Sequence, residues 1–289
     1  MPTDVPSWSP TQPGADGDRP PDRTAPYPVH PEGLPAATIR EGAYEVDFAR
    51  SADELDAILQ LRYEVFNLEL GEGLETSRET GRDEDPFDAV CHHLLVRDLG
   101  PESRPVVGSY RIQTAEMAAA HRGFYSAGEF DIARLPASFV ERAAEVGRAC
   151  VARSHRSTQV LFLLWKGLAA YMTHNDKRYL FGCSSLTSQD PRDAVAMRAY
   201  LEAGGYVHGE YEAPPQPGYE CLWDGPPPPP ATKRDVPPLF QIYLRHGGKV
   251  AAQPAIDREF KTIDFLTFFD IEAMPARMYQ LFFGRPRTP

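Results

Sequence analysis

The sequence predicts an α/β protein in which helices cover one central sheet. Two observations lead to this prediction. Strand-like segments alternate along the chain with helix-like segments, and such interleaving is typical of a sheet with helices packed on it. The chain of 289 residues, 42% of them hydrophobic, is also long enough to bury a sizeable core.

The first elements follow from residue alternation and capping. Residues 43–49 (AYEVDFA) alternate polar and apolar side chains, as a half-buried strand does. Ser51 stands where it can cap a helix over residues 52–70, and Glu54 completes a capping box.

The middle of the chain predicts a hairpin and then a strand–helix pair. Residues 92–99 and 105–114 form two strand-like runs that the turn-rich segment GPESR joins. Residues 143–151 predict another strand. The helix expected over 160–175 is apolar nearly all round, which indicates that it is buried.

The C-terminal part predicts three more helices and two strands. Residues 178–186 are expected to form a buried strand, and Pro191 begins a helix over 191–205 that its two glycines end. After these we expect a helix over 237–248, a strand over 260–270 and a short helix over 271–283.

Proline-rich stretches predict the domain limits. Residues 1–40 contain little that could pack, so we expect a disordered tail. Residues 214–230 end in five consecutive prolines and predict an extended loop. The remainder, 41–289, is then one domain.

Charge and cysteine usage exclude several functions. The net charge of −11 argues against binding to nucleic acid or broadly to an anionic membrane. The four cysteines form no CxxC pair, so neither a zinc site nor a dense disulfide framework is expected, and no metal is predicted. No segment predicts a signal peptide or a membrane span, so we expect a cytoplasmic protein.

A local excess of positive charge stands out in this acidic chain. Residues 147–178 hold six Lys or Arg and one acid, Asp176. A helix that follows a strand exposes backbone N–H groups at its start, where they can bind an anion, and Arg153 and Arg156 lie beside that start. The pattern indicates a pyrophosphate, a phosphopantetheine arm or an acidic carrier protein as partner, or only a solvated basic face.

Glu145 is a candidate base at the head of a predicted strand. Partial burial would raise its pKa and suit it to accept a proton from an amine, although an ion pair with Arg148, which the sequence alone favours slightly, would also explain it. Cys150 and Cys183 lack a base next to them in sequence and are expected to be structural, as are His92 and His93.

Two further features leave both a functional and a structural interpretation open. Ser184 and Ser185 lie at the end of a strand, where they can bind an acceptor or help to cap the following helix. The apolar helix segment 160–165, with Phe265, Phe268 and Phe269, forms either an acyl tunnel or ordinary core.

Several motifs in fixed order resemble a known family. The N-terminal motifs LRYEVFNLELG (61–71), DEDPFD (83–88), VVGSYRIQT (106–114) and EVGRACV (145–151) resemble the GNAT-fold acyltransferases that use acyl carrier protein, a group that includes the acyl-homoserine-lactone synthases. The segments 163–172, 178–186, 236–250 and 256–271 are similar to the hemolysin-like bacterial ornithine N-acyltransferases, which make lyso-ornithine lipid. The likeness covers roughly residues 43–280.

The resemblance implies roles for particular residues. Glu145 would handle the amine proton, while Arg148 and Arg111 would orient the thioester or the amino-acid carboxylate. Substrate contacts would come from Arg62, Phe66, Asp85 and Asp88, with Asp85 and Asp88 holding a cationic group or bracing Arg62. The phosphate loop would comprise Arg156, Ser157, Thr158, Gln159 and Val160, with Arg153 beside it.

The resulting expectation is an N-acyltransferase of GNAT-like fold. It would move a (3-hydroxy) fatty acyl group from acyl carrier protein to the α-amine of ornithine, the first step of ornithine lipid biosynthesis, with transient contact at the inner membrane face and no permanently bound cofactor. The turn at 156–160 lacks the family's glycine, which favours carrier protein over acyl-CoA as donor. The alternatives are an enzyme for glycine or another amino acid, an acyl-homoserine-lactone-type synthase, a short-chain acetyl-CoA enzyme and a non-catalytic binding module.

Overall fold

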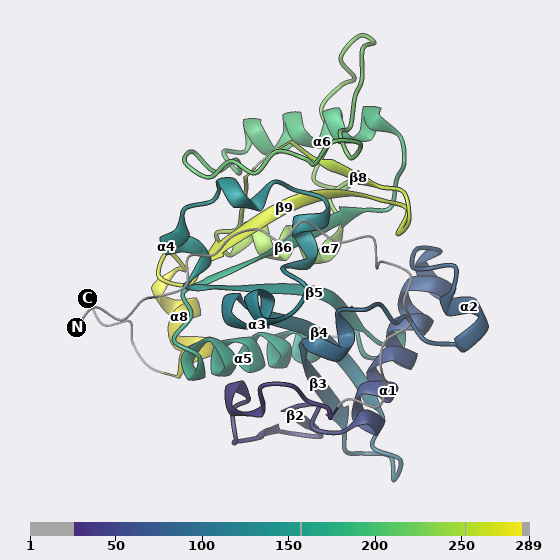
Figure 1. The fold of residues 1–289 in the computed structure, drawn as a ribbon, viewed down its shortest axis with the longest axis vertical. Coiled ribbons are helices and arrows are strands. Elements are labelled where there is room, and N and C mark those ends of the chain that lie inside the picture. Colours follow the sequence, from purple (N-terminus) through teal and green to yellow (C-terminus); the bar gives the residue numbers. More distant parts are fainter. Residues whose placement is uncertain (1–25, 157, 252, 285–289) are drawn as a thin grey trace.

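A computed structural model describes residues 26–156, 158–251 and 253–284. One mixed sheet runs through them in the order β1-β2-β3-β4-β5-β6-β9-β7, with β8 also paired to β9 (Figure 1). The strands are β1 Ile39–Glu41, β2 Tyr44–Phe48, β3 His92–Asp98, β4 Val106–Thr114, β5 Ala143–Val151, β6 Tyr179–Leu186, β7 Lys249–Val250, β8 Ala255–Asp257 and β9 Thr262–Asp270. All neighbours are antiparallel except β5 and β6, which are parallel.

The helices divide between the two faces of the sheet. The helices are α1 Ala52–Arg62, α2 Ser77–Thr80, α3 Ala115–Ala120, α4 Ala137–Val140, α5 Thr158–His174, α6 Pro191–Ala203, α7 Pro238–Arg245 and α8 Ala276–Phe283. Helix α5 connects β5 to β6 and packs beside α8 (Figure 1). Leu180 and Phe269 pack with α5, whereas Phe181 and Phe268 pack with α4. This alternation is the one that neighbouring strand residues must show.

Local sequence explains where several helices begin and end. The Ser51 side chain accepts a hydrogen bond from the Glu54 backbone N–H, and Glu54 in turn accepts one from the Arg50 backbone at 2.7 Å. The helix predicted over 52–70 is present, but residues 63–70 form a π-helix that ends at Gly71, which has φ of 72°. Asp190 caps α6, and Pro191 occupies its first turn as predicted.

The predicted strands and long helices are all present, and the predicted α/β layering is confirmed. The short elements β1, β7, β8, α2, α3 and α4 were not predicted, because two to six residues carry too little periodicity to be recognised. The helix expected over 271–283 begins only at Ala276, after Pro275.

The N-terminal segment differs from the expected tail. Residues 1–25 lie outside the described residues. Within 26–40, Leu34 is buried in the core, Val29 accepts a hydrogen bond from His92, and β1 pairs with β2. Leu34 and the paired strand edge provide the contacts that residue composition alone did not reveal.

The proline-rich loop is attached at its start and exposed at its tip. The Pro214 carbonyl accepts a hydrogen bond from Asp131 at 2.8 Å, and Tyr219 accepts one from Ile256 at 2.7 Å. Leu222 and Trp223 are then exposed, and Figure 1 shows the green loop that follows α6 in the chain protruding beyond α6 at the top of the view. Among the described residues, no helix is long and apolar enough to cross a membrane.

Gly182 allows β5 and β6 to approach closely at the point where they begin to separate. A Cβ at this position would lie 2.1 Å from the Val146 carbonyl oxygen. We predict that Gly182→Ala lowers the free energy of unfolding by about 1–3 kcal/mol, because backbone cannot yield as a side chain can. Urea denaturation would measure the change. Gly147→Ala is the matched control, since its Cβ would meet nothing within 4 Å; equal stability losses in the two variants would contradict the prediction.

Candidate active site

The site begins where two parallel strands part. β5 and β6 pair only from Ala143–Tyr179 to Glu145–Phe181, although both strands continue further. The edges that face each other beyond this point are therefore not paired to one another. A parallel pair that opens in this way presents backbone N–H and C=O groups to whatever lies between the strands.

A cavity of about 840 Å³ occupies this opening and reaches both faces of the sheet. Its apolar end lies on the α5 side and is lined by Val146, Leu161, Leu164, Trp165, Leu168, Leu180, Tyr243 and Phe269. Its polar end is lined by Glu72, Arg111, Gln113, Glu145, Arg148, Ser185, Thr187, Asp257 and Asp264. One end can thus hold a hydrocarbon chain and the other a charged molecule.

Glu145 lines the cavity and is held by three hydrogen bonds. Its carboxylate accepts from the Tyr125 and Ser126 backbone N–H groups, both at 2.7 Å, and from the Ser126 hydroxyl at 2.6 Å. These donors belong to the short helix η4, Tyr125–Gly128. Burial raises the pKa of Glu145, while the bonds from Ser126 and Tyr125 and the charge of Arg111 limit the rise. Glu145 forms no ion pair with Arg148 among the described residues, where Arg148 pairs with Asp83 and Asp85 instead.

Three arginines and three aspartates form a buried ionic network beside the cavity. Its bonds join Arg62 to Asp83 and Asp88, Arg111 to Asp85 and Asp88, and Arg148 to Asp85 and Asp83. The Arg62 side chain has no exposed surface. Burial alone would raise the pKa of Asp88, but Arg62 and Arg111 hold it well below the usual range. Equal numbers of opposite charges make the network neutral, which is how charges persist in a core.

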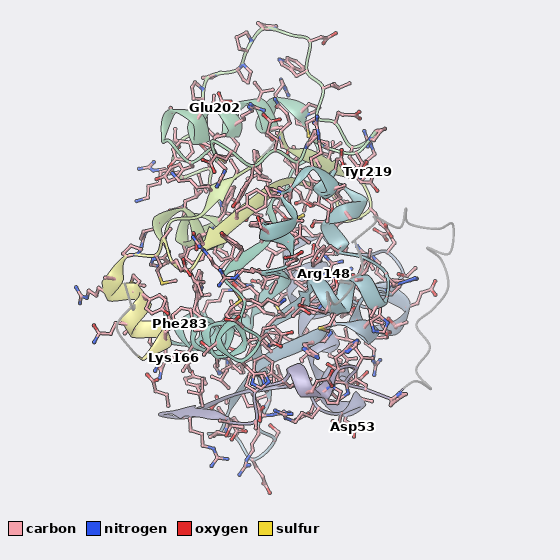
Figure 2. The ribbon with its side chains drawn as sticks, turned by 60° about the vertical axis from the view of Figure 1, so that its left-hand side comes forward. Asp53, Arg148, Lys166, Glu202, Tyr219 and Phe283 are labelled. Carbon is pink, nitrogen blue, oxygen red and sulfur yellow. The ribbon has the colours of Figure 1, made fainter. Side chains whose placement is uncertain are left out.

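Arg148 is one of the two arginines of the network that line the cavity. Figure 2 shows it in the interior of the molecule. Its guanidinium lies 4.3 Å from the centre of the Phe260 ring and 5.0 Å from that of Tyr125. Its backbone has φ of 49°, at an irregularity in the pairing of β4 with β5. Such strain in a non-glycine residue is common where a side chain is aimed at a ligand.

The predicted phosphate-binding residues are only partly assembled. Arg156 lines the cavity and forms a two-bond ion pair with Glu69, at 2.6 and 2.7 Å. Arg153 and Gln159 are exposed and do not line the cavity. The Val160 side chain is fully buried in the α5 core, because it faces the sheet from the first turn of the helix, so only its backbone is left to take part in the predicted phosphate loop. Ser157 and the Thr158 side chain lie outside what the structure describes.

The predicted substrate residues divide into two groups. Phe66, Ser184 and Ser185 line the cavity, as do Arg111 and Arg148. Arg62, Asp85 and Asp88 do not line it. The two aspartates are bonded to arginines, so they brace these arginines rather than offer free carboxylates to a substrate. Of the three phenylalanines proposed for an acyl tunnel, Phe269 lines the cavity while Phe265 and Phe268 are core.

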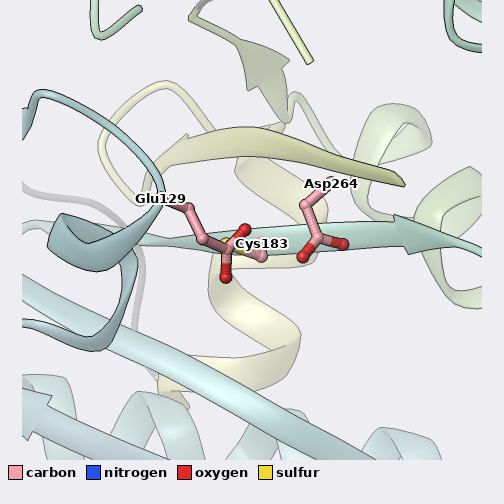
Figure 3. A group of neighbouring side chains, drawn as sticks. All are labelled: Glu129, Cys183 and Asp264. Carbon is pink, nitrogen blue, oxygen red and sulfur yellow. The ribbon is translucent and has the colours of Figure 1, made fainter. Parts of the chain in front are cut away.

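A cluster of acidic side chains near the polar end was not predicted from the sequence. Glu129, Cys183 and Asp264 place ligand atoms within 4.8 Å of one another, and Figure 3 shows their side chains gathered at β6. Burial and the neighbouring negative charges raise the pKa of Glu129 well above its usual value. The available signal was Asp264, the one acid within the mostly apolar and buried segment IDFLTFF.

Cys150 and Cys183 line the cavity, but burial makes both thiols poor nucleophiles. Burial raises the pKa of Cys150 to about 12 and that of Cys183 well above its ordinary value. Both thiols are therefore protonated near neutral pH, and a protonated thiol is a weak nucleophile.

The fold and its site define a class of protein. Residues 61–166 match the family described as Acetyltransferase (GNAT) domain. These residues include β3, β4 and β5 and the first half of α5, so they comprise one wall of the cavity. The chain is an acyltransferase of the GNAT fold.

Curated relatives give a more specific assignment. The L-ornithine N(alpha)-acyltransferase of Agrobacterium fabrum (strain C58 / ATCC 33970) is 33% identical over 254 residues, which are 85% of this chain and 87% of that protein. The Brucella abortus (strain 2308) protein of the same name is 33% identical, with 85% and 90% covered, and that of Rhodobacter capsulatus is 31% identical, with 84% and 96% covered. This chain belongs to the L-ornithine N(alpha)-acyltransferase family, and the predicted resemblance is confirmed. Among solved structures, the acyl-homoserine-lactone synthase LasI is similar with a TM-score of 0.47, at 12% identity over 86% of this chain and 99% of that one.

The ionic network gives a stability prediction. Arg62→Met should lower the free energy of unfolding by about 3–5 kcal/mol, because it leaves Asp83 and Asp88 buried with too few partners. Glu202→Gln, which breaks a surface pair with Arg198, is the control and should change stability by about 0.5 kcal/mol or less. Chemical denaturation of both variants tests this, and a small loss for Arg62→Met would show that the network is not stabilising.

Two buried histidines predict a dependence of stability on pH. Burial lowers the pKa of His92 and of His93 to about 4, whereas an unfolded histidine titrates near 6.5. Between about pH 6.5 and pH 4 the two histidines are therefore protonated in the unfolded chain but neutral in the folded chain. Their contribution to the free energy of unfolding is complete above about pH 6.5 and is lost as the pH falls toward 4.

Denaturation of wild type and His93→Gln at pH 7 and pH 5 would measure this effect. Buried acids with raised pKa act in the opposite direction. The informative quantity is therefore the difference between wild type and His93→Gln in the free energy of unfolding that each loses from pH 7 to pH 5. We expect a smaller loss at low pH for His93→Gln than for wild type, and no difference for His174→Gln at an exposed position. Identical slopes in all three proteins would contradict the assignment.

Proposed function

We propose that this protein transfers a fatty acyl group from a thioester donor to the α-amine of ornithine, the first step of ornithine lipid synthesis. The observation that carries the proposal is the 33% identity over 254 residues to proteins named L-ornithine N(alpha)-acyltransferase. A cavity with one apolar and one acidic end supports it, because a fatty chain and a cationic amino acid must meet in one enclosure.

The acyl donor is proposed to enter where β5 and β6 part. The acyl chain would lie at the apolar end against Leu164, Trp165 and Phe269. The amides of a phosphopantetheine arm would bond to the unpaired strand edges, and its phosphate would lie at the start of α5 near Arg153 and Arg156. The absence of glycine from the turn at 156–160 supports acyl carrier protein, which brings one phosphate, over acyl-CoA.

Glu145 is proposed as the base for a direct aminolysis. The α-ammonium would lose a proton to the Glu145 carboxylate, and the amine would attack the thioester carbonyl carbon. As the N–C bond forms the nitrogen loses a second proton, and the C–S bond breaks. One of the two protons passes from Glu145 to the leaving thiolate, and the other is released to water. A raised pKa suits Glu145 to both transfers.

Arg148 is proposed to stabilise the negative charge of the reaction. Arg148 lines the cavity, and its buried Nε makes no hydrogen bond among the described residues, although it lies 3.5 Å from Asp83 in an ion pair. It could therefore donate to the oxyanion or to the substrate carboxylate, with Arg111 beside it. Phe66 and the hydroxyls of Ser184 and Ser185 are proposed to contact the substrates.

The location proposed for the enzyme is the cytoplasm, with transient contact at the inner face of the membrane. The chemistry of the product supports this, since an acylated amino acid is amphiphilic and partitions to lipid surfaces.

The proposed function predicts a defined product and a defined loss. Purified protein supplied with 3-hydroxyacyl carrier protein and ornithine should give N-acyl ornithine, detected by mass spectrometry, whereas glycine or S-adenosylmethionine should give no comparable product. Glu145→Gln should lower kcat about 10²–10⁴-fold while the protein remains folded. No acylation of ornithine from either carrier-protein or CoA donors would refute the proposal.

A second variant separates catalysis by Glu145 from its support of η4. Ser126→Ala keeps the carboxylate and removes one donor to it, so the pKa of Glu145 should rise. The low-pH limb of the kcat/KM profile should then move to higher pH. A profile that keeps its position while Glu145→Gln is inactive would assign Glu145 a positioning role only.

A further inference from the structure

Asp264 and Asp257 line the polar end of the cavity, and Glu129 lies beside Asp264; the reaction described above uses none of these three carboxylates. Asp264 lies on β9 between the core residues Ile263 and Phe265, Glu129 follows η4, and Asp257 ends β8. Their exposed fractions are 3%, 4% and 6%. No ion pair to any of the three is present among the described residues, in contrast to the aspartates of the Arg62 network.

These carboxylates lack a cation although arginines lie close by. The positive charge of Arg148 acts on Glu129, but Arg148 is bonded to Asp85 and lies near Asp83. One oxygen of Asp264, Oδ1, is buried without a hydrogen-bond partner in the described part of the chain. Asp264 and Asp257 both line the cavity. Buried carboxylates facing an enclosed space are costly unless a cation joins them there.

The spacing from Glu145 matches a short diamine. Glu145 is paired with Phe181 on β6, and the acidic group meets β6 at Cys183, two residues further. Two residues of a strand span about 6–7 Å. Five bonds separate the two nitrogens of ornithine, which gives roughly 6 Å when they are extended.

We propose that Asp264 and Glu129, with Asp257 beside them, bind the side-chain ammonium of the acceptor and thereby select amino acids that carry a second amine. This inference rests on the proposed function, because it assigns the acceptor's second charge to a site. An acceptor of the same length without the amine would leave the carboxylates unpaired, and a polar site strongly rejects a ligand that fails to satisfy it.

The test compares two acceptors that differ by one charged group. Wild type and Asp264→Asn would be assayed as full chains with ornithine and with norvaline, which has the same carbon chain and no second amine. We expect Asp264→Asn to lower the ratio of kcat/KM for ornithine to that for norvaline by about 10²-fold or more, mainly through KM for ornithine. Asp224→Asn, at an exposed position of the proline-rich loop, is the control and should keep the wild-type ratio.

A binding measurement provides a readout independent of turnover. Ornithine should raise the Tm of wild type without any acyl donor, and this increase should be absent in Asp264→Asn and Glu129→Gln. Both variants should fold, because each removes one of two neighbouring acids. If Asp264→Asn does not fold, Glu129→Gln takes its place in the acceptor comparison and in the binding measurement.

The outcomes separate the inference from the proposed function. Wild-type acylation of ornithine with an unchanged ornithine-to-norvaline ratio in the variants overturns the inference and leaves the function. A wild type that acylates a different diamine, with that preference lost in Asp264→Asn, overturns the function and supports the inference. Stabilisation by a divalent metal, removed by EDTA and unmatched by ornithine, would make the group a metal site and overturn the inference.

Discussion

The separation of β5 from β6 after Glu145 and Phe181 is the constraint on which the site depends. A sheet that stayed paired would place backbone against backbone here, and no cavity could pass through it. The separation begins at Gly182, where an added Cβ would meet the Val146 carbonyl oxygen, and the strained backbone of Arg148 lies two residues beyond Val146 on the opposite strand. The apolar and polar ends of the cavity therefore meet within the sheet itself.

The buried charges near this opening follow two different rules. Arg62, Arg111 and Arg148 are matched by three aspartates, so that network is neutral, and only Arg111 and Arg148 of its members line the cavity. Glu129 and Asp264 have no such arginine partners among the described residues, and both have raised pKa values because burial, together with the negative charge of Asp257, disfavours their charged forms. A protein keeps such a costly arrangement where a ligand completes it, which is common at functional sites.

Glu145 connects the two parts of the polar end. By accepting hydrogen bonds from Tyr125 and Ser126 it fixes the start of η4, and Glu129 follows directly after that helix. The position of the acidic group is thus coupled to the residue proposed as base. A change at Glu145 acts on the chemistry and on the acceptor subsite together, which is why variants at Ser126 and Asp264 are needed to distinguish the two effects.

The sequence by itself determined the α/β class, the long elements, the family resemblance and the candidacy of Glu145, Arg111 and Arg148, because these depend on local periodicity and on motifs that are continuous in the chain. Only the tertiary structure decided which charges are paired. Asp85 and Asp88 are bound to arginines from three elements, Val160 faces the core, and Asp264 meets Glu129 across more than a hundred residues. Electrostatic pairing depends on distances in space, and the spacing of residues along a chain does not encode them.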